Sequence, residues 1–331
     1  MLREFHHILD GFKGGKRVLN YTLRRLLALI PVLFIVSIIV FMIIHLTPGN
    51  PAFLILGEDS SPEAVAQLEQ QLGLDKPKVV QYFDWLRKII VGDLGESIYS
   101  EEPVSQIIAE RIGPTFSLMI VSMFLTLIIA IPTAIFIVWK RNTVLDPLFL
   151  SGSLLGTSIP EFWLALLLVL GLGVTIPIFP VAGYAPITDG LLGWLHHLLL
   201  PGIVLAAVEI GLIARMLRDS MLDSMNQDYT KTARGKGVKE STVLVKHVFS
   251  NALIPTTTVI GLTVAGLLGG TVIIETIFTI PGIGQLLIDS IHRRDYPVIQ
   301  GVVLFIAIVY VIINLIVDLL YAFLDPRIRY D

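Results

Sequence analysis

Long apolar blocks alternate with polar segments along the whole chain. Six blocks are long enough to cross a bilayer, because a membrane-spanning helix needs about 20 consecutive apolar residues. They occupy residues 26–46, 115–138, 147–174, 198–217, 255–278 and 298–321. Pro160 interrupts the third block and is expected to kink or break its helix. The pattern therefore predicts an all-α polytopic membrane protein with six transmembrane helices.

The polar region between the first two spans carries helix signals of its own. Ser60 and Glu63 resemble a capping box, Pro62 suits a first helical turn, and Gly73 can end the helix. A second helix is expected to start near Pro77. Its apolar side would be formed by Val79, Tyr82, Phe83, Leu86 and Ile90. We therefore expect a small helical insertion outside the membrane. Segments 177–194 and 279–297 are predicted as loops.

The composition supports a membrane protein and excludes several chemistries. Of the 331 residues, 54% are hydrophobic and 15% charged, whereas a soluble chain carries about 25% charged residues. Cysteine is absent, which excludes disulfides, thiolate metal sites and a cysteine nucleophile. The net charge of −3 argues against a nucleic-acid partner. The first apolar block is long enough to remain a span rather than a cleaved signal peptide.

Basic residues are distributed unequally between the two sides of the membrane. Six spans place both termini on one side, and 17 Lys and Arg residues fall there. The short segments on the other side carry two, when the long 47–113 region is left out of the count. The positive-inside rule then predicts cytoplasmic termini. The expected regions are a cytoplasmic basic arm (1–25), the first transmembrane helix (26–46), an extracytoplasmic helical region (47–113), a permease domain (114–322) with a polar cytoplasmic loop at 218–254, and a cytoplasmic tail (323–331).

The longest polar segment between two apolar blocks after the insertion runs from Leu217 to Pro255. Helical spacing continues through Met221, Met225 and Tyr229, so span four should extend beyond the membrane. Asp228 is a candidate N-cap for a short new helix, which Gly235 and Gly237 could end in the left-handed conformation. A helix this short is marginal in water and needs a partner surface or its own flanks. Physics alone leaves open whether it is an ordinary basic loop or a docking helix.

Several motifs resemble the permease subunits of ATP-binding cassette importers, specifically the peptide-importer branch. Lys231-Thr232-Ala233, three residues and Gly237 resemble the Glu-Ala-Ala signature loop of that family, with lysine in place of glutamate. The resemblance covers nearly the whole chain. Other matching stretches are Leu46 to Pro51, Gly92 to Ser97, Glu275 to Phe278, Pro281 to Gly284, Arg294 to Tyr296 and the Asp325-Pro326-Arg327 tail.

This resemblance implies a set of partners and a site for each. The chain would pair with a second permease, two cytoplasmic ATPases and an extracytoplasmic solute-binding protein in the bacterial inner membrane, and would carry peptides. ATP and Mg²⁺ would bind the ATPases, so no cofactor, metal or catalytic residue is expected here. The residues expected to couple to an ATPase are Tyr229, Thr230, Lys231, Thr232, Ala233, Arg234, Gly235, Lys236 and Gly237. Candidate contacts with the binding protein are Pro281, Gly282, Gly284, Arg294, Asp295 and Tyr296.

Charged residues inside spans are costly and often functional. Candidate residues of the translocation path are Glu161, Gly266, Gly270 and Glu275. For Glu161 and Glu275 the alternative is an interhelical hydrogen bond or a position at the headgroups, and this alternative is favoured for Glu209 and Asp318. Small residues such as Gly266 and Gly270 let membrane helices approach closely.

The polar residues in and near the spans also raise functions other than that of an importer permease. An ion-coupled secondary transporter would use Glu209 and Glu275 as a proton relay, although the inverted repeats of that class are not visible. An intramembrane hydrolase lacks its motifs. The pairs His6-His7 and His196-His197 have no third metal ligand placed by spacing. An importer of the same family carrying glutathione or nickel chelates stays open beside dipeptides and oligopeptides.

Overall fold

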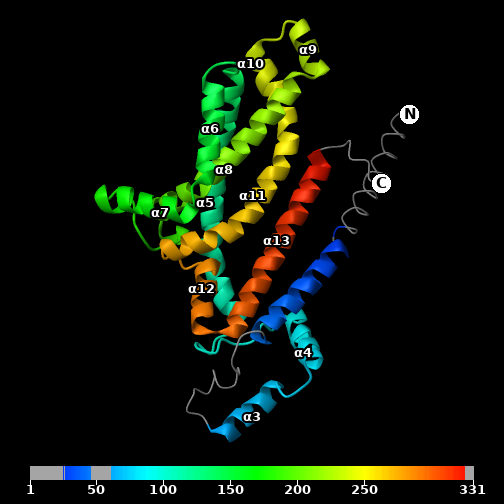
Figure 1. The fold of residues 1–331 in the computed structure, drawn as a ribbon, viewed down its shortest axis with the longest axis vertical. Coiled ribbons are helices and arrows are strands. Elements are labelled where there is room, and N and C mark those ends of the chain that lie inside the picture. Colours follow the sequence, from blue (N-terminus) through cyan, green and yellow to red (C-terminus); the bar gives the residue numbers. More distant parts are fainter. Residues whose placement is uncertain (1–24, 26, 46–60, 325–331) are drawn as a thin grey trace, which may run out of the picture. The chain divides into compact units, whose positions relative to one another are not determined.

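A computed structural model describes residues 25, 27–45 and 61–324, and the described part is helical (Figure 1). Five helices are long and apolar enough to cross a membrane, and a bent helix pair brings the number to as many as six. The predicted all-α polytopic class is therefore confirmed. The basic arm up to residue 24, His6-His7, Ser60, the 46–51 motif and the end of the tail lie outside the described residues. The helices are the unlabelled Leu27–His45, α3 (Pro62–Leu72), α4 (Lys78–Ile90), α5 (Val104–Trp139), α6 (Leu145–Ser158), α7 (Glu161–Leu168), η1 (Val169–Thr175), η2 (Ile187–Asp189), α8 (Leu191–Met225), α9 (Asp228–Gly235), α10 (Glu240–Thr242), η3 (Val243–Phe249), α11 (Ser250–Ile277), α12 (Ile283–Arg293) and α13 (Tyr296–Leu324).

The third apolar block is broken where the sequence predicts. α6 ends at Ser158, Pro160 is the N-cap of α7, and the two helical segments meet at 93°. Proline disfavours helical geometry in the residue before it, and Ile159 is extended accordingly (φ −80°, ψ 121°). Figure 1 shows α7 directed away from α6.

The chain forms two compact units. The first comprises residues 1–111, 286–312 and 330–331, and the second comprises residues 112–285 and 313–329. The second unit holds α6 to α11 and most of α5. α8 and α11 are its most extensively paired helices, and its buried cluster is built from α5, α8, α9, η3 and α11.

Three predicted boundaries are corrected by the structure. α5 begins at Val104 rather than residue 115 and continues through Pro114, because Val104 and Ile108 are buried and hold the first turns in place. The predicted loop at 279–297 contains α12. α8 begins at Leu191, within the segment predicted as a loop up to residue 194. Its end at Met225 confirms the predicted extension of span four beyond residue 217, although the helix stops before Tyr229.

The insertion between the first two spans contains both predicted helices. The N-cap of α3 is Ser61 rather than Ser60, and its hydroxyl accepts a hydrogen bond from the Ala64 amide at 3.2 Å. Gly73 ends this helix in the left-handed conformation (φ 70°), as predicted. α4 follows Pro77 directly, also as predicted.

Candidate coupling element and membrane site

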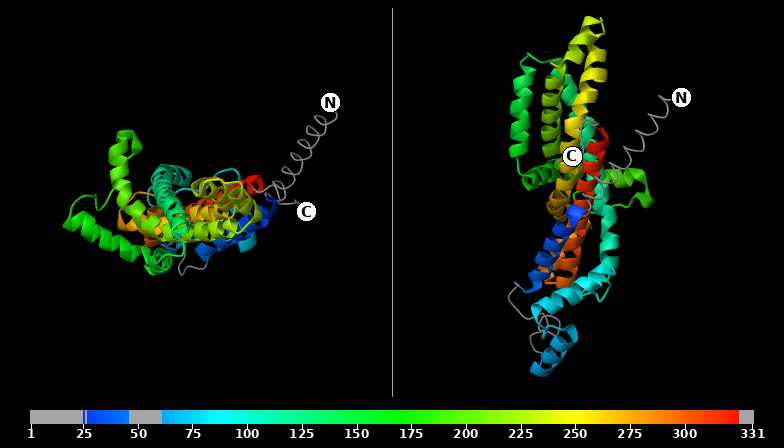
Figure 2. Two further views of the ribbon diagram at one scale, coloured as in Figure 1. Left: turned by 90° about the horizontal axis from the view of Figure 1, so that it is seen from above. Right: turned by 90° about the vertical axis from the view of Figure 1, so that its right-hand side faces the viewer.

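The predicted short helix between two long ones is α9. Gln227 is its N-cap, so the predicted N-cap at Asp228 is wrong by one position. The Asp228 carboxylate instead accepts from Lys231 Nζ at 3.0 Å, and its charge favours the first turn of a helix. Gly235 is the last helical residue, and Gly237 supplies the left-handed conformation (φ 77°). Figures 1 and 2 show α9 at the far end of the α8 and α11 pair.

α9 has an inner face that packs on the chain itself. Thr230 is fully buried and its hydroxyl donates to the Ser224 carbonyl at 2.8 Å. Ala233 is also buried, in a cluster with residues of the neighbouring helices. This packing explains how so short a helix persists, because tertiary contacts replace the missing helical length. Thr230 and Ala233 were predicted to couple to the ATPase, and here their side chains contact this chain.

The outer face of α9 is exposed. Tyr229 is 41% exposed despite its size. The other predicted coupling residues on this face are Lys231, Thr232, Gly235, Lys236 and Gly237. Arg234 lies between the two faces and donates two hydrogen bonds to the Glu240 carboxylate, at 3.0 and 2.7 Å. This bidentate pair ties α9 to the start of α10.

A π-helical segment, η3, follows α10 and changes which side chains are buried. Val243, Leu244 and Val248 are buried, whereas Val245 is 53% exposed. An α-helical reading would have placed Val245 on the same face as Val248 and Ala252. The π-helix closes its hydrogen bonds over five residues instead of four, so the α-helical spacing does not hold here.

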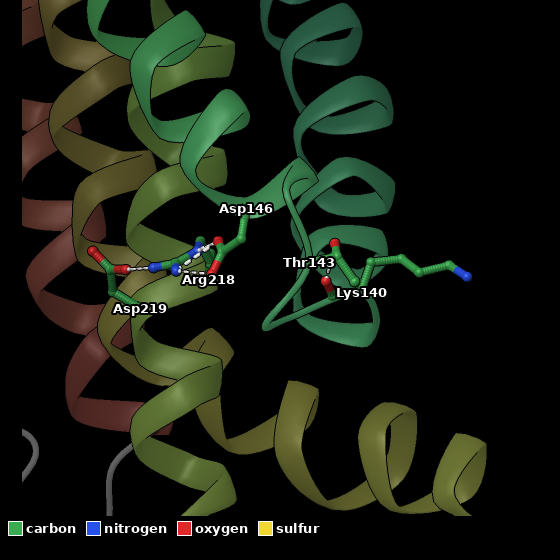
Figure 3. A network of polar contacts seen from close by, with 5 residues as sticks. All are labelled: Lys140, Thr143, Asp146, Arg218 and Asp219. Carbon is green, nitrogen blue, oxygen red and sulfur yellow. Dashed lines mark hydrogen bonds and ion pairs between the residues drawn. The ribbon is translucent and has the colours of Figure 1, made fainter.

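An ion pair that sequence reasoning missed joins α6 to α8 (Figure 3). Arg218 Nε and Nη2 donate to the two Asp146 carboxylate oxygens, each at 2.7 Å, and Nη1 donates to Asp219 at 2.6 Å. The side chains of Arg218 and Asp146 are only 11% and 18% exposed. The only signal in the sequence was an arginine continuing the apolar spacing of α8, and nothing pointed to Asp146 as its partner.

Glu275 is fully buried near the end of α11 and holds the start of α12. Its Oε1 accepts from the Thr115 hydroxyl at 2.6 Å, and its Oε2 accepts from the Gly284 and Gln285 amides at 2.7 and 3.1 Å. The Thr115 oxygen in turn accepts from the Ile283 amide at 2.8 Å. The carboxylate thus caps orphan amides in the first turn of α12.

Two of the predicted glycines lie beside the Glu275 carboxylate, where a larger residue would not fit. A Cβ atom at Gly282 would collide with the Glu275 carboxyl group, and one at Gly284 would collide with Val272 in α11. Both glycines are buried. Gly282 and Gly284 therefore pack beside the Glu275 carboxylate and are not exposed to a binding protein in this structure.

The remaining candidate contacts with a binding protein divide by exposure. Asp295 and Tyr296 are each 4% exposed, and Asp295 accepts from the Ser97 hydroxyl at 2.5 Å. Arg294 is exposed and adopts a left-handed backbone (φ 59°), and Pro281 is half-buried. Of the six residues predicted for this contact, Arg294 and Pro281 remain accessible.

The candidate path residues are partly brought together. A Cβ atom at Gly270 would lie 3.3 Å from Glu161 Oε2, so this glycine leaves room for the carboxylate. Gly266 lies on the same helix and is exposed. Glu209 accepts from the Thr263 hydroxyl at 3.1 Å between α8 and α11, which confirms the interhelical hydrogen bond favoured for it. His196 Nε2 lies 2.7 Å from the Ile178 carbonyl oxygen, and no metal-binding group of three His, Asp or Glu occurs among the described residues.

Two family descriptions match most of the chain. Residues 127–330 match the binding-protein-dependent transport system inner membrane component family, and residues 18–119 match the N-terminal region of such membrane components.

Curated relatives match over nearly their full length. A putative peptide transport system permease protein of Brucella abortus is 47% identical over 93% of this chain and 98% of the relative. The dipeptide transport system permease protein DppB of Alkalihalophilus pseudofirmus and the glutathione transport system permease protein GsiC of Salmonella typhimurium are each 42% identical, over 95% of this chain and 100% of each relative. The fold resembles an inward-facing MetNI methionine ABC transporter (TM-score 0.54, 16% identity), covering 67% of this chain and 97% of that chain.

Proposed function

Because this chain belongs to the binding-protein-dependent transport system inner membrane component family and is a permease subunit of an ABC importer, we propose that it carries peptides through a path shared with a second permease. Its named relatives transport peptides, dipeptides or glutathione. A solute-binding protein delivers the substrate, and two ATPase subunits, which bind ATP and Mg²⁺, drive the cycle. Both termini and α9 face the cytoplasm, in agreement with the distribution of basic residues.

The observation that carries the coupling role is the two-sided packing of α9. Its inner face is fixed to the membrane helices through Thr230 and Ala233, and its outer face presents Tyr229, Thr232 and Lys236 to water. An element held this way transmits displacement to α8 and α11 without deforming. The outer face of α9 therefore docks in a groove of one ATPase subunit and moves with it.

The transport assignment is tested with the complex reconstituted from this chain, a second permease, the ATPases and the binding protein. We expect ligand-loaded binding protein to stimulate ATP hydrolysis, and uptake to persist after the proton gradient is collapsed with ATP held constant. Uptake that stops with the gradient would instead support an ion-coupled transporter. A panel of dipeptides, oligopeptides, glutathione and nickel chelates identifies the substrate class.

Glu161 is proposed to meet the protonated amino group of the peptide within the path. Support comes from its position beside Gly270 in the membrane domain and from the cost of a charge in a span. Glu161→Gln should reduce uptake of peptides with a free amino terminus and leave uptake of N-acetylated peptides unchanged. Equal effects on both peptide classes would exclude this role.

A further inference from the structure

Helix α4 has an apolar side that is wider than the surface it packs on. Tyr82 and Trp85 share the part that faces the Leu27–His45 helix. Tyr82 donates or accepts a hydrogen bond with Ser37 at 2.8 Å, and its ring lies 5.4 Å from that of Phe41. Trp85 lies 5.8 Å from the same phenyl ring. These contacts fix α4 against the first span in the same compact unit.

The other half of the apolar side is exposed. Val79, Phe83 and Ile90 follow one another at helical spacing and are 66%, 58% and 75% exposed. Lys88 is exposed on the opposite side of the helix, whereas the exposed Arg87 lies at the edge of this strip, beside Phe83. A helix in water would not leave three large apolar side chains in a row uncovered.

The depth of the contacts indicates what covers the strip. The described part of the first span, Leu27–His45, has 19 residues, which at 1.5 Å per residue is about 28 Å and matches the thickness of the hydrocarbon layer. Ser37 lies about 12 Å from the His45 end and farther from the other end. The Tyr82 hydroxyl, which contacts Ser37, is therefore within the hydrocarbon layer. The α4 backbone at Tyr82 lies no farther from that layer than the length of one tyrosine side chain.

The exposed apolar residues of the first span also indicate that lipid covers the strip. Ile35 and Ile39 of the Leu27–His45 helix are 56% and 58% exposed, as expected of side chains that contact acyl chains. The exposed strip of α4 adds to the apolar, lipid-facing surface of the Leu27–His45 helix. The cationic Arg87 and Lys88 suit the anionic headgroups that border it.

We propose that α4 is an interfacial membrane helix, with Val79, Phe83 and Ile90 among lipid acyl chains and Arg87 and Lys88 at the headgroups. In the proposed orientation it lies at the extracytoplasmic face, so part of the predicted insertion outside the membrane is embedded in lipid. The proposal depends on the first span being in a bilayer and not on the transported substrate.

Because the chain contains no cysteine, a single introduced cysteine is its only labelling site, and the variant chain is labelled before it is assembled with its partners. Phe83→Cys and Ile90→Cys report the apolar strip, and Lys88→Cys is the matched control on the opposite side of the same helix. Each spin-labelled chain is then studied in the full complex in lipid nanodiscs. We expect oxygen to accelerate relaxation of the label several-fold more than a water-soluble nickel chelate at positions 83 and 90. The order should reverse at position 88.

Two results would overturn the proposal. Greater access of the nickel chelate at both positions 83 and 90 would place the strip in water. An immobilised label shielded from both reagents would mean that another protein covers the strip. Val79→Cys provides a third position on the same strip if one of the other variants does not assemble.

Discussion

The Thr115 hydroxyl lies 2.6 Å from Glu275 Oε1, a hydrogen bond between residues 160 positions apart in the chain. The same carboxylate accepts two amides of α12. Glu275→Ala would leave these donors unsatisfied, and each unsatisfied buried group costs about 1–3 kcal/mol. We expect a large fall in the melting temperature of the purified protein and in its abundance in the membrane.

Glu275→Gln separates this structural role from a role in the translocation path. Its amide oxygen can still accept from the Gly284 and Gln285 amides, so most of the stability should be retained. Normal melting of both variants, combined with impaired peptide uptake by Glu275→Gln, would favour the path role instead.

Removal of one partner of the Arg218–Asp146 pair should destabilise the contact between α6 and α8. Asp146→Ala leaves a mostly buried guanidinium without its bidentate acceptor, a change that costs about 3 kcal/mol. The free energy of unfolding of the purified protein measures it. Asp219→Ala is the control, because the Asp219 side chain is 54% exposed and an exposed pair contributes about 0–1 kcal/mol. Equal losses in both variants would contradict the assignment.

The two faces of α9 should respond differently to added volume. Thr232→Trp enlarges the exposed face and should uncouple ATP hydrolysis from uptake while the melting temperature stays unchanged. Ala233→Leu adds volume to the buried cluster and should destabilise the protein by about 1–3 kcal/mol. Simultaneous measurement of ATPase activity, uptake and melting distinguishes the two. Normal coupled uptake by Thr232→Trp would argue against docking through this face.

Close packing of α11 on α13 should depend on Gly261. A Cβ atom there would collide with Val317, so Gly261→Ala is expected to cost about 1–3 kcal/mol through overpacking. The double variant Gly261→Ala, Val317→Ala should recover much of the loss. Gly269→Ala is the matched control on α11, because a Cβ atom there meets nothing within 4 Å. A destabilised control, or a double variant no better than Gly261→Ala, would refute this explanation.

The sequence by itself determined the class of protein, the break at Pro160 and the position of the short helix α9. These features depend on interactions local in the chain: apolar block length, proline geometry and the left-handed glycine at 237. The motifs around Lys231 to Gly237 also pointed to the family that the comparisons then established. α12 escaped prediction because its first turn is capped by Glu275 of α11, a residue outside the helix itself.

Only the tertiary structure decided which side of each element is covered. The sequence did not separate Ala233, which faces inward, from Thr232, which faces outward, because the family motif assigns residues 229–237 to the ATPase contact as one block. Arg218 and Asp146 are 72 positions apart in the chain. Glu275 and Thr115 are 160 positions apart. Such contacts arise from how the helices pack, and no local pattern in the sequence encodes the partner.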